Sequence, residues 1–331
     1  MDWAPVWLDA SWQAEAIAWV DEQLDRLGRW RTGPAEQPHV RPWSTVMSMP
    51  TSGGTTWFKA AGPGTAYEAR LLRQLAAWGT PMLLAPIATE PERGWLLFPD
   101  GGLRLRDRLR GSAGVDDWLR ILPAYAMLQR TLARRASDLV DLGVPDLRPA
   151  SMPALLARLR EDGATGMADA DRARLRALAP EYADWCAALA ASGIEPSLQH
   201  DDLHDGNVFV DPAVGGMIGD VGGDRIFDWG DAVVGHPFGT LLATLRSIAS
   251  RDAALDRSTL LRLRDAYLEP WTADHSRAAL NETVRTGLRV GAVGRAFAWE
   301  RALSGVPHDA HGEYAGAVGE WLLELFEPTV I

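Results

Sequence analysis

Apolar residues near the start of the chain recur at the spacing of an α-helix. They lie within residues 11–28, and Gly28 at the end of this stretch offers a stop signal. Polar residues fill the positions between them, as on the exposed side of a surface helix. The pattern therefore predicts an amphipathic opening helix. Its apolar positions are Trp12, Ile17, Val20, Leu24 and Leu27.

From Arg29 to Phe98 the pattern changes to short apolar runs that contain Thr, Trp and Val and are broken by clusters of Gly and Pro. Runs of this kind are typical of strands joined by turns. We predict a small mixed antiparallel sheet with one helix inserted, the helix at 65–78. The predicted strands lie near 25–31, 43–50, 55–60, 83–89 and 94–98.

The remainder of the chain has largely helical periodicity. The segment "FPDGG", Phe98 to Gly102, precedes it, and we predict a boundary there between an N-terminal lobe, 1–99, and a helical C-terminal lobe, 100–331. Two β-rich runs, "NVFVD" and "RIFDWG", interrupt the helices. The fold class is therefore α+β with two lobes. The predicted helices are 103–110, 115–136, 152–161, 168–191, 236–250, 257–270, 277–303 and 309–326.

Composition and charge narrow the class of protein. Hydrophobic residues make up 47% and charged residues 23%, which is ordinary globular usage. A formal charge of −11 argues against a nucleic-acid partner. The longest apolar stretch, "PMLLAPIA", is too short to span a bilayer, and the first residues do not resemble a secretion signal. With a single cysteine, Cys186, we expect a cytoplasmic protein without membrane contact.

One window concentrates polar side chains that suit phosphoryl transfer. In "LQHDDLHDGNVFV", residues 198–210, the run from His200 to Asn207 reads H-D-D-L-x-x-x-N, and Asp228 begins D-W-G 26 residues after Asp202. The protein-kinase catalytic loop reads H-R-D-L-x-x-x-N and is followed by D-F-G. Phosphoryl transfer needs a carboxylate that orients the attacking hydroxyl and oxygen ligands for Mg²⁺. The two linked motifs therefore indicate this chemistry.

On these motifs the chain resembles the aminoglycoside phosphotransferase and choline kinase branch of the protein-kinase-like fold, whose loop reads H-G-D-x-H-x-x-N and whose metal motif reads I-D-W. The resemblance implies ATP- and Mg²⁺-dependent phosphorylation of a hydroxyl on an aminoglycoside, amino sugar, sugar or amino alcohol. By this carry-over Asp202 is the catalytic base, Asn207 and Asp228 are Mg²⁺ ligands, and His200 and His204 brace the loop.

The only lysine of the chain gains a candidate role from the same resemblance. Lys59 ends the strand-like run "TTWFK", where kinases place the lysine that pairs with the α- and β-phosphates. Its implied partner is Glu68. The run from Thr65 to Glu68 also has the pattern of a capping box, in which this glutamate would close its own helix. Both interpretations of Glu68 stay open from the sequence.

The rest of the nucleotide site is less defined. The phosphate-covering loop is either "PTSGG" or, favoured by topology, the stretch 32–45, where Ser44 or Thr45 could donate a hydroxyl. The resemblance places adenine against the lobe connection, near Leu97, Phe98 and Asp100. The C-terminal helices would shape the acceptor pocket, although core aromatics and solvated polar faces are the better explanation for each of those side chains taken separately. The acceptor candidates are Trp299, Glu300, Asp309, His311 and Glu313.

Some residues depart from the family pattern. Asp201 stands where relatives have glycine. Asp205 and Asp231 are most simply solvated loop charges, although Asp231 could approach the second face of the metal. After the metal motif relatives have G-D-P-x-x-D-L-A, whereas this chain has "GHPFGTLLA", with His236 for the first acid and Gly or Thr for the second. The second acid stabilises the catalytic loop in that family. How this chain holds the loop is therefore a structural question.

Two other functions fit parts of the same window. His200 to His204 imitates the zinc-protease pattern H-E-x-x-H, but that motif needs a helix, and Gly206 with the β-rich "NVFV" disfavours one. A non-catalytic nucleotide-binding relative is the other alternative. It is disfavoured because the lysine, the base, the asparagine and the metal aspartate are all present.

Overall fold

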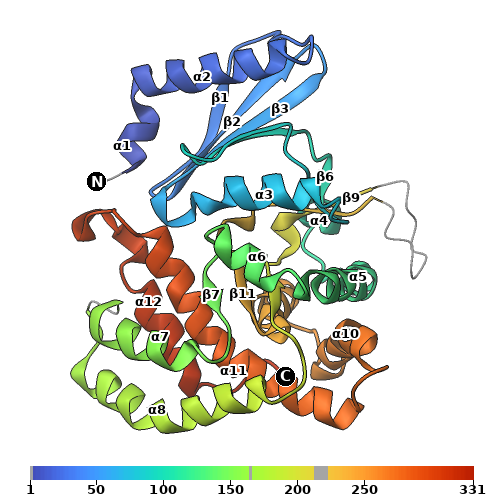
Figure 1. Ribbon diagram of the computed structural model, residues 1–331, viewed down its shortest axis with the longest axis vertical. Coiled ribbons are helices and arrows are strands. Elements are labelled where there is room, and N and C mark those ends of the chain that lie inside the picture. Colours follow the sequence, from blue (N-terminus) through green and yellow to red (C-terminus); the bar gives the residue numbers. More distant parts are fainter. Residues whose placement is uncertain (1–2, 164–165, 212–222) are drawn as a thin grey trace. The chain divides into compact units, whose positions relative to one another are not determined.

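A computed structural model describes residues 3–163, 166–211 and 223–331. The chain forms two compact units, which are described separately (Figure 1). The first unit comprises Met1–Gly101 together with Trp299–Ala315, and the second comprises Gly102–Ala298 together with Gly316–Ile331. The sequence did not indicate that the stretch after the long C-terminal helix belongs with the N-terminal residues.

A five-stranded sheet of order β1-β2-β3-β5-β4 forms the centre of the first unit, with antiparallel neighbours throughout. Alternation along the strands separates two faces. In β3, Phe58 and Ala60 are fully buried on one face, while Lys59 points to the other. The strands are β1 (Glu36–Arg41), β2 (Ser44–Thr51), β3 (Gly54–Ala61), β4 (Ala88–Glu90) and β5 (Trp95–Pro99).

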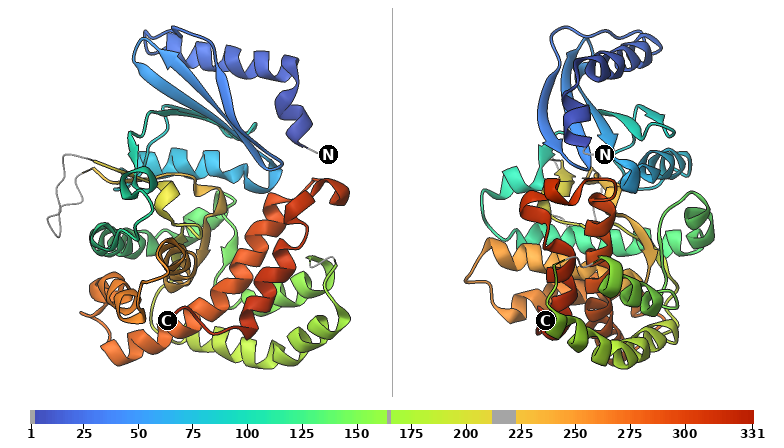
Figure 2. Two further views of the ribbon diagram at one scale, coloured as in Figure 1. Left: turned by 180° about the vertical axis from the view of Figure 1, so that it is seen from behind. Right: turned by 90° about the vertical axis from the view of Figure 1, so that its left-hand side faces the viewer.

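Two N-terminal helices, α1 (Trp3–Leu8) and α2 (Ala10–Asp25), cover one face of this sheet (Figure 2). Asp9 caps α2, because its carboxylate accepts hydrogen bonds from the amides of Ser11 and Trp12. The predicted opening helix is therefore present. The buried cluster between the helices and the sheet includes Trp7, Trp19, Val20, Leu24, Met47, Met49, Phe58, Trp95 and Leu97.

The first predicted strand, 25–31, is wrong. α2 continues to Asp25, and Gly28 closes its end with a left-handed backbone (φ 65°), so the chain turns there; beyond the turn, Arg31 forms an isolated antiparallel bridge with Thr51. The first strand is β1, inside the stretch predicted to be the phosphate-covering loop. Its hairpin with β2 turns at Pro42 and Trp43. The strand expected at 83–89 is likewise reduced to the short β4.

Helices dominate the second unit, as predicted. The stretch 309–326, predicted as one helix, is divided between the two units and forms short 3-10 turns around a single α-helical segment. Helices α8 and α11 pack together, since the Tyr182 hydroxyl donates to the Val290 carbonyl at 3.3 Å (Figure 2). The helices are α4 (Leu105–Leu109), α5 (Val115–Ala133), α6 (Ala136–Asp141), α7 (Met152–Arg158), α8 (Asp169–Ala190), α9 (Leu241–Arg251), α10 (Arg257–Leu268), α11 (Arg277–Ala302) and α12 (Ala317–Leu323).

Two small sheets in the second unit contain the strands on either side of the polar loop from His200 to Asn207. One has the order β10-β9-β6 and the other the order β7-β11-β8. The strands are β6 (Leu103–Arg104), β7 (Asp146–Leu147), β8 (Ser197–Gln199), β9 (Val208–Val210), β10 (Arg225–Ile226) and β11 (Val233–Gly235). Across the described ranges, no helix has both the length and the apolar character needed to cross a membrane.

Candidate functional site

Strand pairing brings the two sequence motifs together. The loop from His200 to Asn207 joins β8 to β9, and Asp228 follows β10. Because β9 and β10 are antiparallel and Val208 lies opposite Ile226, the residue before β9 meets the residues after β10. The Phe227 amide accordingly donates to the Asn207 carbonyl at 3.1 Å. Asn207 and Asp228 therefore lie at the same end of one hairpin.

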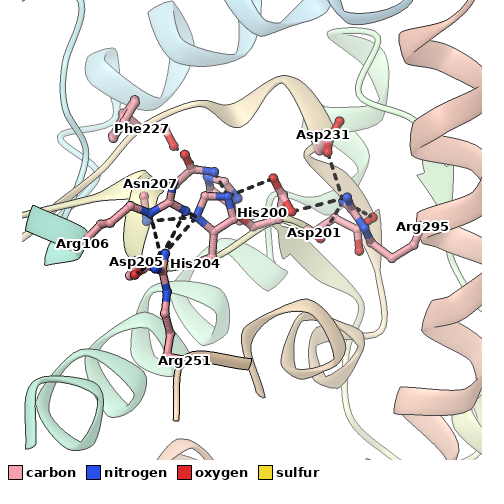
Figure 3. A network of polar contacts seen from close by, with 12 residues as sticks. Arg106, His200, Asp201, His204, Asp205, Asn207, Phe227, Asp231, Arg251 and Arg295 are labelled. Carbon is pink, nitrogen blue, oxygen red and sulfur yellow. Dashed lines mark hydrogen bonds and ion pairs between the residues drawn. The ribbon is translucent and has the colours of Figure 1, made fainter. Parts of the chain in front are cut away.

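His200 ties the loop to the metal motif. It is fully buried, its Nε2 lies 2.8 Å from the Phe227 carbonyl oxygen, and its ring centroid lies 4.8 Å from that of Trp229 (Figure 3). Burial lowers the pKa of His200, so the ring is neutral and Nε2–H donates to the carbonyl. His200 therefore contacts the segment that contains the metal motif, and its predicted role as a bracing residue stays a prediction.

His204 lies beside the proposed base. Its Nδ1 accepts from the Gly206 amide at 2.9 Å, so Nε2 carries a proton, and Nε2 lies 3.4 Å from Asp202 Oδ2. Asn207 also supports Asp202, because its Nδ2 donates to the Asp202 carbonyl at 3.0 Å. These contacts hold the backbone and the carboxylate of Asp202 in place.

Asp205 differs from the sequence interpretation. It is buried, not a solvated charge, and it lies between two arginines that the sequence did not single out (Figure 3). Arg106 donates to Asp205 Oδ1 through Nε and Nη2 at 3.2 Å, and Arg251 Nη2 lies 2.8 Å from Oδ2. Removing the carboxylate from water is offset by these charge-assisted bonds.

A buried arginine on α11 accompanies Asp202. Arg295 Nη2 lies 3.3 Å from Asp202 Oδ1. Burial alone favours the neutral carboxyl, but the charge of Arg295, together with the hydrogen bond from His204, outweighs it and holds the pKa of Asp202 well below its usual range. Asp202 is therefore ionised at neutral pH. The same guanidinium lies 3.0 Å from Asp231, which is not a solvated loop charge either.

Two aspartates of the site have left-handed backbones. Asp201 and Asp228 both have a φ of 62°, a backbone region that residues other than Gly, Asn and Asp rarely adopt. The conformation at position 201 explains why a glycine fits there in relatives. Strained backbones of this kind are concentrated at functional sites.

This chain lacks the second acid of the family pattern G-D-P-x-x-D, and other side chains contact the loop from His200 to Asn207. The hydroxyl of Tyr125, on α5, accepts from the His200 amide at 2.8 Å and lies 3.4 Å from the Thr240 hydroxyl. Burial raises the pKa of Tyr125, so the hydroxyl stays neutral. Tyr125 on α5 thus supports the backbone of the loop at His200.

His236 begins the helical turn that follows. Its Nδ1 accepts from the Phe238 amide at 3.3 Å and its Nε2 lies 3.4 Å from the Ser192 hydroxyl. Burial lowers the pKa of His236 to about 3. The ring is therefore a neutral capping group at the start of this turn.

The depressed pKa of His236 makes stability depend on pH. In the unfolded chain the imidazole protonates near its usual pKa of about 6.5, whereas in the folded protein it stays neutral until about pH 3. Its stabilising contribution is full above pH 6.5 and declines as the pH falls. Between pH 7 and pH 5 we expect it to cost about 2 kcal/mol of the free energy of unfolding.

Urea unfolding of the wild type and His236→Asn at both pH values measures this loss. Asparagine keeps an acceptor for the Phe238 amide without a titrating ring. The variant should lose about 2 kcal/mol less than the wild type between pH 7 and pH 5. Equal losses in the two proteins would show that His236 does not contribute.

The donor set fits a magnesium ion. Because Asn207 Nδ2 is used by the Asp202 carbonyl, the amide oxygen is the atom left to bind a cation, and Asp228 supplies a carboxylate at the same hairpin end. Mg²⁺ is usually held by one or two protein oxygens together with substrate phosphates and water. The described residues contain no group of three or more His, Cys, Asp and Glu side chains able to hold a metal ion.

The zinc-protease alternative fails on local structure. His200 to His204 is a loop, not a helix. His200 Nε2 already bonds a carbonyl oxygen and His204 Nδ1 already bonds an amide. The two imidazoles therefore do not present a shared metal-binding face.

The candidate nucleotide residues of the first unit centre on a buried ion pair. Lys59 Nζ lies 2.6 Å from Glu68 Oε2, and the Glu68 side chain is fully buried. Helix α3 (Tyr67–Ala77) begins after the 3-10 turn Pro63–Thr65, and Ala66 occupies its N-cap position. Glu68 therefore pairs with the lysine and does not close a capping box with Thr65.

The sharp turn that this pairing needs depends on small residues. A Cβ atom at Gly64 would lie 2.0 Å from the Arg301 carbonyl oxygen, and one at Gly62 would lie 3.0 Å from the Trp43 carbonyl oxygen. Both partners belong to the first unit. This close backbone packing allows the chain to turn sharply enough for Lys59 and Glu68, nine positions apart in the sequence, to meet.

The remaining candidate nucleotide residues are less distinctive. Ser44 is buried at the start of β2, directly after the turn of the β1–β2 hairpin. In β5, Leu97 is fully buried and its carbonyl accepts from the Ile87 amide, while Phe98 lies opposite Trp57. Asp100, just after the strand, is exposed.

The candidate acceptor residues fall in the first unit. Trp299 stacks on Tyr314 with ring centroids 5.3 Å apart, and both rings contact Trp43 edge-on. His311 Nε2 lies 3.0 Å from the Val306 carbonyl oxygen, and Glu300 is partly exposed. Glu313, two positions after His311, is exposed. The side chain of Asp309 lies outside the described part of the chain.

Comparison with known proteins identifies the family. The model of the phosphotransferase enzyme family matches residues 59–239, more than half of the chain, whereas comparison with curated proteins gives no match. This range contains Lys59, Glu68 and both motifs.

Solved structures with the same fold include three phosphotransferases. The aminoglycoside 2′-phosphotransferase-IIIa in its GDP complex is 12% identical with a TM-score of 0.60, covering 93% of this chain and 97% of that one. The Plasmodium vivax ethanolamine kinase is 13% identical (TM-score 0.57, 89% and 82% covered). The macrolide 2′-phosphotransferase of Brachybacterium faecium is 18% identical (TM-score 0.57, 93% and 98% covered). The chain therefore belongs to the phosphotransferase enzyme family and has the protein-kinase-like fold.

Proposed function

We propose that the protein transfers the γ-phosphoryl group of ATP to a hydroxyl of a small molecule, with Asp202 as the catalytic base and Mg²⁺ bound by Asn207 and Asp228. The observation that carries this proposal is the β9–β10 pairing, which brings Asn207 and Asp228 to one hairpin end beside an ionised Asp202. The relatives' acceptors are an aminoglycoside, a macrolide and ethanolamine, as their names state. The acceptor class proposed here is accordingly an aminoglycoside, amino sugar, sugar or amino alcohol.

In the proposed reaction the acceptor oxygen forms a bond to the γ-phosphorus, and the bond from that phosphorus to the bridging oxygen breaks. ADP leaves with the bonding electrons, and the hydroxyl proton passes to an Asp202 oxygen. Because its pKa is depressed, Asp202 is a weak base that orients the hydroxyl and accepts the proton late. Bound Mg²⁺ would neutralise charge on the phosphate oxygens.

The first unit supplies the proposed phosphate-binding cation. Lys59 would bind the α- and β-phosphates and Glu68 would hold it in place, which their 2.6 Å contact supports. Further proposed nucleotide contacts are Ser44, Leu97, Phe98 and Asp100. The proposed acceptor contacts are Trp299, Glu300, Asp309 and His311.

A screen of ADP release tests the function. The wild type is incubated with Mg-ATP, and separately with Mg-GTP, alone and with aminoglycosides, macrolides, sugars and amino alcohols. We expect one acceptor class to raise nucleoside diphosphate release above the acceptor-free rate, and EDTA to abolish that increase because the phosphates need a divalent cation. A nucleotide-dependent thermal shift without transfer to any acceptor would favour the non-catalytic, nucleotide-binding alternative.

A further inference from the structure

A single guanidinium in the second unit lies among three aspartates of the site (Figure 3). Arg295 Nη1 donates to the Asp201 carbonyl at 2.9 Å and to Asp231 Oδ2 at 3.0 Å, and it lies 3.8 Å from Asp201 Oδ2. Its Nη2 lies 3.3 Å from Asp202 Oδ1. Arg295 lies on α11, outside the residues that the family model matches.

Two glycines of α11 lie against segments of the site. A Cβ atom at Gly294 would make ordinary contacts, 3.4 Å from Leu147 and 3.8 Å from the Asp201 carboxylate, and one at Gly291 would lie slightly closer than that, 3.3 Å from the Gly239 carbonyl oxygen. The helix that carries Arg295 therefore packs closely against these segments.

The contacts of Arg295 join two segments that are separate in the sequence. Asp201 and Asp202 belong to the catalytic loop, whereas Asp231 lies three residues after the proposed metal ligand Asp228. Arg295 is buried, so its charge is tolerated only because carboxylates and a carbonyl surround it. A guanidinium can donate in several fixed directions at once, which suits it to this position.

We propose that Arg295 is a positioning residue that fixes the Asp202 carboxylate relative to the Asp228 segment, by bonding Asp202 and the Asp201 carbonyl on one side and Asp231 on the other. This rests on the function proposed above. The acid at position 201, where relatives have glycine, adds a further negative charge beside the same guanidinium. Arg295 itself is not expected to touch the substrate.

The test compares Arg295→Met, Arg295→Lys and a matched control. Methionine keeps an unbranched chain and removes the charge, while lysine keeps the charge on one nitrogen and cannot reproduce both donor directions. The control, Arg264→Met, removes another buried arginine of the same unit, whose Nε donates to Asp265 at 2.8 Å. Activity is ADP release from Mg-ATP with the fastest acceptor of the screen, or with water when no acceptor raises it, below every variant's unfolding temperature.

For Arg295→Met we expect kcat to fall by about 10- to 100-fold, because small displacements of a catalytic group cost rates of this order. The KM for Mg-ATP and the thermal shift with Mg-ATP should match those of the wild type. Arg295→Lys should recover part of kcat, and Arg264→Met should stay within about twofold of the wild type. A purely structural Arg295 would instead give folded variants with wild-type kcat, which overturns the proposal.

A double-mutant cycle separates the contact from the reaction. If Arg295 bonds Asp231, the loss of stability in Arg295→Met with Asp231→Asn should be smaller than the sum of the two single losses. Additive losses would overturn the contact. A wild type that releases no ADP would reject the proposed function, whereas unchanged kcat in folded Arg295→Met would reject only the positioning by Arg295.

Discussion

Asp202→Asn should bind Mg-ATP like the wild type and lose about 10²- to 10⁴-fold in kcat, the range expected when a general base is removed. Asparagine has nearly the same shape but cannot accept the hydroxyl proton. The backbone contacts of this position, including the hydrogen bond from Asn207 to the Asp202 carbonyl, need no carboxylate. The measurements are initial rates of ADP release with the acceptor found in the screen and the thermal shift with Mg-ATP.

Asp184→Asn is a matched control, because Asp184 is an exposed aspartate on α8. Its kcat should equal that of the wild type. Turnover retained by Asp202→Asn would remove Asp202 from the role of base. A lost thermal shift in Asp202→Asn would instead mean that the substitution disturbs nucleotide binding.

Asp228→Asn should lose the part of the ATP-induced stabilisation that depends on Mg²⁺, together with turnover. A ligand present at 100 times its Kd stabilises a protein by about 2.7 kcal/mol, so the wild type should show a clear difference between ATP with Mg²⁺ and ATP with EDTA. The neutral amide is a weaker ligand for a hard cation than the carboxylate. In Asp228→Asn the two conditions should therefore give nearly the same unfolding temperature.

Asparagine is the better substitution here because Asp228 has a left-handed backbone, which asparagine tolerates and alanine does not. In Asp228→Ala the backbone strain should lower the free energy of unfolding by about 1–2 kcal/mol, so this variant should unfold at a lower temperature even without ligand. The shift caused by Mg-ATP, not the unfolding temperature itself, is the relevant quantity for both variants. A Mg²⁺-dependent shift as large as that of the wild type would contradict the proposed metal site.

Short-range patterns predicted much of the architecture. The opening helix, the antiparallel sheet with one inserted helix and the helical remainder follow from hydrophobic periodicity, which reports the face that each element buries. The strand at 25–31 was mispredicted because apolar residues at the end of α2 continue into the turn at Gly28 without a change in composition. The boundaries of β1 and β4 depended on pairing with distant strands, which periodicity does not encode.

By itself the sequence determined the family resemblance, since the catalytic and metal motifs are contiguous and carry their own residue types. It also singled out Lys59, because a lone lysine among 33 basic residues is conspicuous. It left Glu68 between two interpretations, and only the 2.6 Å contact of the folded chain decided for the ion pair. The catalytic roles assigned to these residues stay predictions for the experiments above.

Tertiary structure alone decided how the site is supported. Arg295 reaches the Asp201 carbonyl across 94 residues of sequence, Arg106 reaches Asp205 across 99, and Tyr125 reaches the His200 amide across 75. No local pattern marks these side chains, because the periodicity of a helix reports which face is buried and not which distant residue a side chain meets. Charges that look solvated in the sequence, such as those of Asp205 and Asp231, become ion pairs because packing removes them from water and brings distant arginines to meet them.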